Sequence, residues 1–173
     1  MKINKKVEDV LNKQVNAEFW SAYLYLSMSS WCESQGLKGF ANWMRVQYQE
    51  EMAHALKIFN FILTRSGQAI LAPIAAVDTS WDSVLELFEE TYRHECVVTD
   101  LIGNCYEVAV AERDHATASM LQWFIDEQTE EENNALEIID QIKLLGKEGQ
   151  GIYHLDKELA TRVFVDPTIT PAP

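Results

Sequence analysis

Acidic, imidazole and amide side chains interrupt four otherwise apolar patterns in this chain, at positions that suit metal binding. The interruptions are Glu18, Glu51 with His54, Glu95, and Gln128 with Glu131. Carboxylates with a single imidazole suit iron or manganese, although zinc can use the same ligands. An ionised carboxylate buried alone would be costly or would take up a proton, so four of them together predict bound cations.

The competing interpretation is that each glutamate lies at the edge of a helix and reaches solvent, as most helical glutamates do. Two features favour a site instead. All four patterns break near mid-length, and Glu51 and His54 stand three residues apart, on one face of a helix. One metal ion could bind both residues while Glu51 bridges to a second ion.

The apolar patterns alternate spacings of three and four residues, which is typical of the seam between packed α-helices. The stripes run from Val7 to Tyr25, from Phe40 to Phe61, from Leu85 through Tyr92 and Thr99 to Tyr106, and from Leu121 to Leu145. Breakers and caps predict helices from Lys5 to Glu33, from between Gly36 and Gly39 to Arg65, from about Ser80 to Ala111, and from Asp114 to Gly146. Ser80 or Asp82 is the expected N-cap of the third helix, and Asp114 that of the fourth.

The connections predict the topology. Short turns join the first two helices and the last two, which makes two antiparallel hairpins. Residues 67–79 could span roughly 40 Å when extended, enough to return the third helix parallel to the second. This connection is apolar enough that we expect it to pack against protein, such as a neighbouring subunit.

The fold class expected is therefore all-α: a four-helix bundle with a long crossover between helices two and three and a short fifth C-terminal helix. The fifth helix is expected within the amphipathic residues 153–164. Residues 1–162 are expected to form one domain, and the proline-rich residues 163–173 a flexible C-terminal tail.

Composition excludes several function classes. The formal net charge is -13 and the pI about 4.6, which argues against a nucleic-acid partner. Neither an apolar run long enough to span a membrane nor a secretory signal is evident, so a cytoplasmic location is expected. The three cysteines, Cys32, Cys96 and Cys105, show no spacing typical of a disulfide framework or a zinc site.

A second acidic pattern accompanies the first. Glu50, Glu127 and Glu130 each precede an inward residue by one position, a rotation of about 100° around the helix. If the second and fourth helices are neighbours, these carboxylates could form an additional cation site. A solvated acidic stripe explains them equally well.

Tyr25 stands two turns after Glu18 on the same face, so it is expected beside the centre, where it could hydrogen-bond a ligand or supply an electron. A tyrosine in a core stripe more often serves packing. Trp123 and His94 are left out of the catalytic set. Trp123 is more simply explained by packing, and His94, which is adjacent to Glu95, points to a different side of the helix.

Four segments, NAEFWSAYLYL, QEEMAHALKIF, YRHECVVTDLI and WFIDEQTEEEN, resemble the ferritins, most closely the bacterial non-haem type, and the resemblance extends over residues 1 to about 162. It implies an iron storage protein with ferroxidase activity. Such a homo-oligomer, a 24-mer shell, oxidises Fe(II) with dioxygen or hydrogen peroxide at a dinuclear centre and stores ferric oxyhydroxide.

The resemblance also implies roles for individual residues. Glu18, Glu51 and His54 would hold the first iron, and Glu51, Glu95 and Glu131 the second, with Gln128 and Tyr25 beside them. A third iron would lie at Glu50, Glu127, Glu130 and the shared Glu131.

Two departures from the family pattern concern iron entry and haem. Ala118 and Leu121 stand where animal-type shells carry the acidic pair of their threefold pores. Met52 matches the haem-ligating position of bacterioferritins, but the fourth helix lacks their second Glu-x-x-His, so no haem is expected. The alternatives are a haem-containing bacterioferritin, a non-cage diiron oxidase or electron-transfer bundle, and a structural bundle with protonated glutamates.

Overall fold

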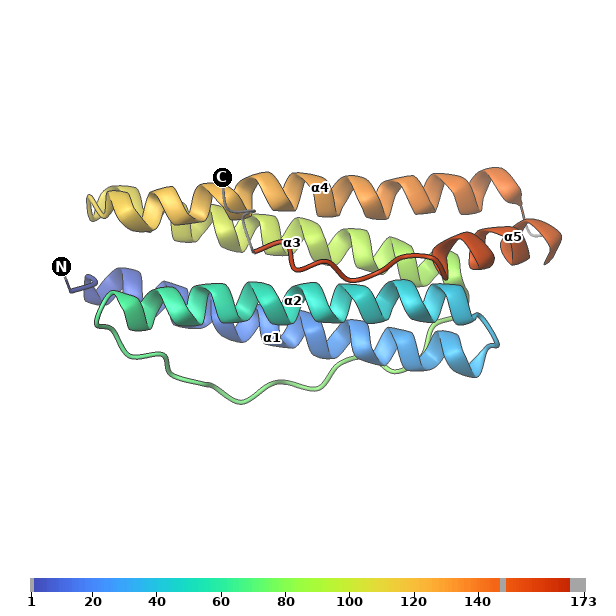
Figure 1. The fold of residues 1–173 in the computed structure, drawn as a ribbon, viewed down its shortest axis with the longest axis horizontal. Helices are drawn as coiled ribbons and strands as arrows, with labels where there is room; N and C mark the ends of the chain where they lie inside the picture. The colour runs from blue at the N-terminus through green and yellow to red at the C-terminus, as the bar shows by residue number, and fades with distance from the viewer. Residues whose placement is uncertain (1, 147–148, 169–173) are drawn as a thin grey trace.

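The computed structural model describes residues 2–146 and 149–168, and over these ranges the chain forms five helices and no strand. Their bounds are α1 Lys5–Ser34, α2 Lys38–Thr64, α3 Val84–Ala111, α4 His115–Leu145 and α5 Gly149–Leu159. Figure 1 shows α1 to α4 as four long rods lying side by side, with α5 across one end. The predicted all-α bundle with a long crossover and a short fifth helix is confirmed.

Side-chain caps define where three of the helices begin. Asn4 and Asp114 cap α1 and α4, accepting hydrogen bonds from the backbone N–H groups of Lys6 and Thr117. The predicted cap of α3 was wrong, because Ser83 rather than Ser80 or Asp82 caps it. Glu86 provides the physical reason: its N–H donates to Ser83 Oγ while its carboxylate accepts from the Asp82 N–H, close to a capping box.

The crossover between α2 and α3 follows α1 and is held to it through the backbone. Four α1 side chains donate to crossover carbonyls; they are Asn12 to Gln68 (3.0 Å), Asn16 to Ala72 (3.3 Å), Trp20 to Ala76 (3.4 Å) and Ser27 to Asp78 (2.7 Å). Figure 1 shows this segment passing along the outside of the bundle. Its apolar side chains, among them Leu71 and Ile74, are exposed in the single chain.

The buried face of α3 differs from the predicted stripe. Leu85, Tyr92, Thr99 and Tyr106 are only half-buried. The buried residues are Val84, Leu87, Phe88, Thr91, Glu95, Val98, Ile102, Cys105 and Ala109. The helix is therefore rotated so that its tyrosines lie at the boundary, where the hydroxyl reaches polar surroundings, while smaller residues enter the core.

The ends of α4 and α5 depart slightly from expectation. Leu145, assigned to the inward stripe, is 38% exposed, and α4 ends there. The fifth helix occupies 149–159 rather than 153–164. Residues 147–148 of the connecting loop and residues 169–173 of the predicted tail lie outside the described residues.

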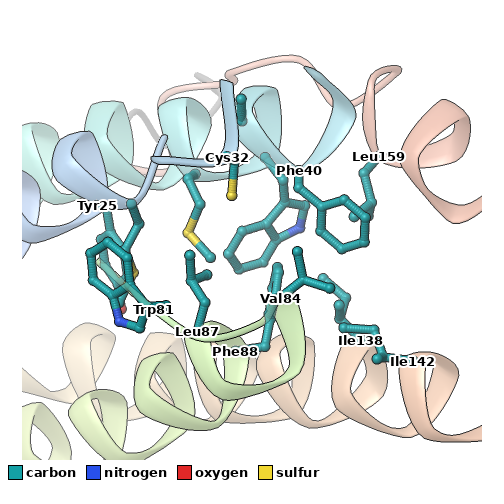
Figure 2. Packing of buried hydrophobic residues seen from close by; sticks show 14 of the residues in the cluster. Tyr25, Cys32, Phe40, Trp81, Val84, Leu87, Phe88, Ile138, Ile142 and Leu159 are labelled. Atoms are coloured by element: carbon teal, nitrogen blue, oxygen red, sulfur yellow. The ribbon is translucent and has the colours of Figure 1, made fainter. Parts of the chain in front are cut away.

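Two apolar clusters fill the bundle, one toward each end. Figure 2 shows the cluster nearer α5, where Phe40, Phe88 and Ile142 from three helices meet. The other is built around Leu11, Ile62 and their neighbours. The polar residues of the four stripes lie between these clusters, so they sit in a low-dielectric layer at mid-bundle. No helix in the described ranges has both the length and the apolar character that crossing a membrane requires.

Candidate metal centre

Each long helix contributes a nearly inaccessible acidic or basic side chain to the layer between the apolar clusters. Glu18 comes from α1, Glu51 and His54 from α2, Glu95 from α3 and Glu131 from α4, and all are at most 4% exposed. The helical repeat places them there, because each occupies a seam position of its own helix.

The first group consists of Glu18, Glu51 and His54, whose potential ligand atoms all lie within 4.8 Å of one another. The Glu51 Oε2 atom is 3.5 Å from His54 Nδ1. Among the described residues, Glu18 Oε2, Gln47 Oε1 and His54 Nε2 are buried without a hydrogen-bond partner. Buried polar atoms in folded proteins almost always have a partner, so the two of these atoms that belong to this group make it a candidate ligand site.

A second group shares the imidazole with the first. The ligand atoms of His54, Glu127 and Glu131 also lie within 4.8 Å of one another, and Glu127 Oε1 is 3.8 Å from His54 Nε2. The sequence analysis placed Glu131 both with Glu51 and Glu95 and, as a shared residue, with Glu127 at the third position. The structure adds that His54 lies within the same distance of Glu127 and Glu131.

Glu95 is held by hydrogen bonds within the chain rather than grouped with other ligand atoms in the described residues. The Tyr25 hydroxyl donates to its Oε1 atom, and Gln128 Nε2 donates to its Oε2 atom at 3.2 Å and to its backbone carbonyl at 3.2 Å. Tyr25 and Gln128 therefore lie where the sequence placed them, beside the acidic layer. They orient a carboxylate that faces the other ligands.

Burial dominates the electrostatics of this layer. Desolvation raises the pKa of Glu95 to about 7, and desolvation followed by the charge of Glu95 raises the pKa of Glu131 to about 7. The pKa of Glu51 is raised well above its ordinary value for the same reason. Desolvation works against the charged form of His54, but Glu127 and Glu51 outweigh it and raise the His54 pKa. These carboxyls thus hold protons more tightly than exposed carboxyls do, and a metal cation that binds them displaces those protons.

The outer carboxylates have three different surroundings. Glu127 joins the inner group, and Glu50 accepts a hydrogen bond from the Arg162 Nη2 atom at 2.7 Å. Glu130 is exposed. Desolvation raises the pKa of Glu50 to about 7, although Arg162 opposes that shift.

Two glutamines support the centre in ways that the sequence reasoning did not assign. Gln14 Nε2 donates to Glu18 Oε1 at 2.8 Å, and Gln47 Nε2 donates to Glu131 Oε2 at 2.8 Å. A signal was present, because both glutamines occupy the inward stripes one turn before a candidate ligand. No pattern in the sequence indicated that Arg162 lies near the site, since it is far from the other site residues along the chain.

Four residues that the sequence analysis discussed but did not assign to the site can now be placed. His94 turns away to Ser21, with 2.8 Å between Ser21 Oγ and His94 Nε2, as expected from its position beside Glu95. Trp123 packs edge-on against the His54 ring. Met52 is half-buried, whereas Leu121 is fully buried in the second apolar cluster.

Comparisons with known proteins agree with this architecture. The ferritin-like domain family matches residues 8–145. A bacterial non-heme ferritin of Bacteroides fragilis (strain 638R) is 42% identical over 160 residues, which cover 92% of this chain and 99% of that protein. One from Escherichia coli O157:H7 is 38% identical over 151 residues, or 87% of this chain and 92% of the relative.

A solved structure gives the same result in three dimensions. It is described as a novel open pore ferritin from the hyperthermophilic archaeon Archaeoglobus fulgidus. It superposes with a TM-score of 0.93 at 47% sequence identity, covering 94% of this chain and 100% of that one. By sequence, helix order and fold, the chain belongs to the ferritin family.

Proposed function

We propose that this protein stores iron and is a ferroxidase, oxidising Fe(II) with dioxygen at a dinuclear centre inside each subunit. The observation that carries the proposal is the pair of unpartnered buried atoms, Glu18 Oε2 and His54 Nε2, beside the Glu51 carboxylate. Together they offer oxygen and nitrogen ligands at one place between the helices, a donor set that suits iron.

A purely structural polar layer fits this geometry poorly. In such a layer each buried polar atom would have a partner, because an unsatisfied group costs about 1–3 kcal/mol. Glu95 and Glu131 have partners from Gln128 and Gln47, but among the described residues Glu18 Oε2 and Gln47 Oε1 have none. His54 Nε2 faces only Glu127 Oε1, at 3.8 Å, which is beyond hydrogen-bond distance. The energy lost at these atoms is recovered when a cation binds.

The chemistry follows from placing two Fe(II) ions next to one another. Each gives one electron to the same dioxygen molecule, which takes up two protons to become hydrogen peroxide. Hydrolysis of the two Fe(III) products to oxyhydroxide then releases protons. The chain's part is to supply anionic ligands in a dry layer and to accept and release protons at carboxyls such as Glu95 and Glu131.

Individual side chains have separate tasks in this scheme. Gln14 and Gln47 each hold one oxygen of a ligand carboxylate, which leaves the other oxygen for iron. Tyr25, buried and hydrogen-bonded to Glu95, orients that carboxylate and can supply an electron close to the irons. Glu127 and Glu50 extend the acidic layer toward the surface between α2 and α4 and supply a third position.

Storage in a 24-mer cage is part of the same proposal. It is supported by family membership and by relatives named bacterial non-heme ferritins, which match nearly the whole chain. The net charge of -13 suits a protein that handles cations. Particle mass measured by light scattering separates a cage from a small diiron oxidase of similar fold.

The proposed centre is tested by anaerobic Fe(II) titration of the metal-free protein, followed by a pulse of oxygen. We expect two or three irons per chain to bind and the tightest two to oxidise rapidly. A Glu50→Ala/Glu130→Ala variant should lose only the third. Binding no greater than that of a surface-acidic control protein would show that the polar layer serves structure alone.

The raised pKa of Glu131 predicts how stability without metal depends on pH. Between its ordinary value of 4.5 and about 7, the folded protein keeps a proton that the unfolded chain has released. This contribution to the free energy of unfolding is complete below pH 4.5 and is lost as pH rises through 7. Glu131→Gln has no carboxyl to ionise at this position. As pH rises from 5 to 8, its free energy of unfolding should therefore increase relative to that of wild type by on the order of 2–3 kcal/mol.

Chemical denaturation of both chelator-treated proteins at four pH values in this range measures that difference. Glu130→Gln is the matched control, because it removes a neighbouring but exposed carboxylate of α4. A constant stability difference between Glu131→Gln and wild type across the range would contradict the prediction.

A further inference from the structure

The chain that follows α5 runs back along α2, as Figure 1 shows. Asn42 Nδ2 ties the turn to α2 by donating to the Leu159 and Arg162 carbonyls at 3.2 and 2.9 Å. Further along, Asp166 comes close enough to His54 and Lys57 for their charges to interact. Residues 162–166 therefore lie over the outer side of the centre.

Arg162 is the point where this segment meets the acidic layer. Its Nη2 atom donates to Glu50 Oε2 at 2.7 Å, and its guanidinium lies 4.5 Å from the Trp43 ring centroid. The Arg162 and Glu50 side chains are only 23% and 13% exposed, so solvent screens the pair weakly. Glu50 is thus already paired with a cation that belongs to the protein.

We propose that Arg162 is a tethered competitor for the outer carboxylates, which lowers their affinity for metal ions and so makes the inner centre fill first. This inference rests on the proposed function and adds to it the order of filling. Arg162 holds the Oε2 atom of Glu50, so a metal ion can bind that oxygen, or both oxygens together, only after the guanidinium has left. The competition weakens binding of every cation at Glu50 by the same factor, but it leaves Glu18, Glu51 and His54 untouched, because Arg162 contacts none of them.

The structure also provides somewhere for the displaced guanidinium to go. A pocket of about 200 Å³ between α2, α4 and α5 is lined by Arg162, Glu137 and Glu158. A side-chain rotation into this pocket brings the guanidinium toward other carboxylates instead of leaving a charge unpaired. Displacement is therefore compatible with the fold, and the Asn42 anchors to the backbone need not break.

The test measures metal binding without turnover. Metal-free wild type and Arg162→Gln are titrated with Co(II), whose absorption and heat of binding report each site. We expect the weakest site of Arg162→Gln to bind on the order of tenfold to a hundredfold more tightly, as loss of one charge-assisted hydrogen bond implies, with the site at Glu18, Glu51 and His54 unchanged. Arg162→Lys, which keeps the charge, should fall between the two.

Two controls test whether the tighter binding of Arg162→Gln comes from Glu50. One tests for a general effect of charge, and the other for binding at Glu127 or Glu130 without Glu50. Arg45→Gln removes an exposed positive charge from α2 and should change nothing. Adding Glu50→Gln to Arg162→Gln removes the contested carboxylate and should abolish the gain. A crystal of wild type soaked in Zn(II) should show Arg162 turned away from Glu50 wherever the outer position is filled.

Several results would overturn the proposal. They are an unchanged weak site in Arg162→Gln, an equal gain in Arg45→Gln, or zinc bound at Glu50 with the guanidinium still in place. If the inner residues bind Co(II) normally in such a case, only the role of Arg162 fails. If wild type binds no Co(II) at the inner residues, the proposed function fails with it.

Discussion

His54→Ala is expected to lose the rapid phase of Fe(II) oxidation, with a fall in initial rate of about a hundredfold or more. His54 belongs to both ligand groups, so its loss removes the nitrogen donor from each. Changing a residue that merely supports a ligand costs about 10–100-fold in affinity or activity, and removing a ligand costs at least as much. Stopped-flow absorbance after mixing the anaerobic Fe(II)-loaded variant with oxygen measures the rate.

The matched control is His94→Ala. His94 is also largely buried, and burial lowers its pKa to about 4, but it contacts Ser21 and the rings of Trp20 and Tyr25 rather than the candidate ligand atoms. Its loss should leave the rapid phase within a few-fold of wild type. A normal rapid phase in His54→Ala, with two irons still bound, would refute the assignment of this imidazole to the centre.

Gly39→Ala is expected to be among the most destabilising single substitutions in the chain. A Cβ atom at residue 39 would stand 1.5 Å from the Asp156 carbonyl oxygen and 3.0 Å from the Ala160 nitrogen, both backbone atoms. Rotation of a side chain cannot relieve the overlap, so α5 must move away from α2. That movement also breaks the hydrogen bonds from the Gly39 and Phe40 N–H groups to Asp156 Oδ1, at 2.7 and 3.1 Å.

We expect the substitution to cost about 3–5 kcal/mol and to lower Tm by about 10 °C, measured by calorimetry at a fixed protein concentration. Gly103→Ala is the control, because Gly103 lies within α3 with nothing within 4 Å of the added carbon. There alanine should be neutral or stabilise by up to about 1 kcal/mol, because it favours the helix. Equal Tm values for the two variants would show that α5 does not hold the start of α2 as described.

The helices and their order could be predicted because heptad periodicity, caps and breakers are local signals. The inward face of α3 could not be placed exactly, since that helix offers two adjacent apolar faces. Tyr92 and Tyr106 fit one pattern, while Leu87 and Val98 fit the other. Both faces of α3 carry apolar side chains, so hydrophobicity alone does not show which of them is buried. The packing of the whole bundle decides this, and it places the face without the tyrosines inside.

The candidate site shows the same division between local and long-range information. The proximity of Glu18, Glu51 and His54 could be predicted, because each lies at a seam position and the short turn between the first two helices makes those helices neighbours. The pairing of Glu50 with Arg162 could not be predicted, because it depends on the path of an extended segment after α5. An extended segment has no periodicity that tells which surface it will follow.

The division of the polar layer between two hairpins has a consequence for how the chain folds. α1 packs most extensively with α2, and α3 with α4, so each hairpin forms from contacts close in sequence and leaves its acidic residues hydrated on an open side. If the hairpins form first, their docking dehydrates Glu18, Glu51, Glu95 and Glu131 together, and protons or a divalent cation would lower the electrostatic cost of that step. We therefore expect the folding rate of this chain to depend on pH and metal concentration as well as on topology, which refolding kinetics measured with and without a divalent cation would test.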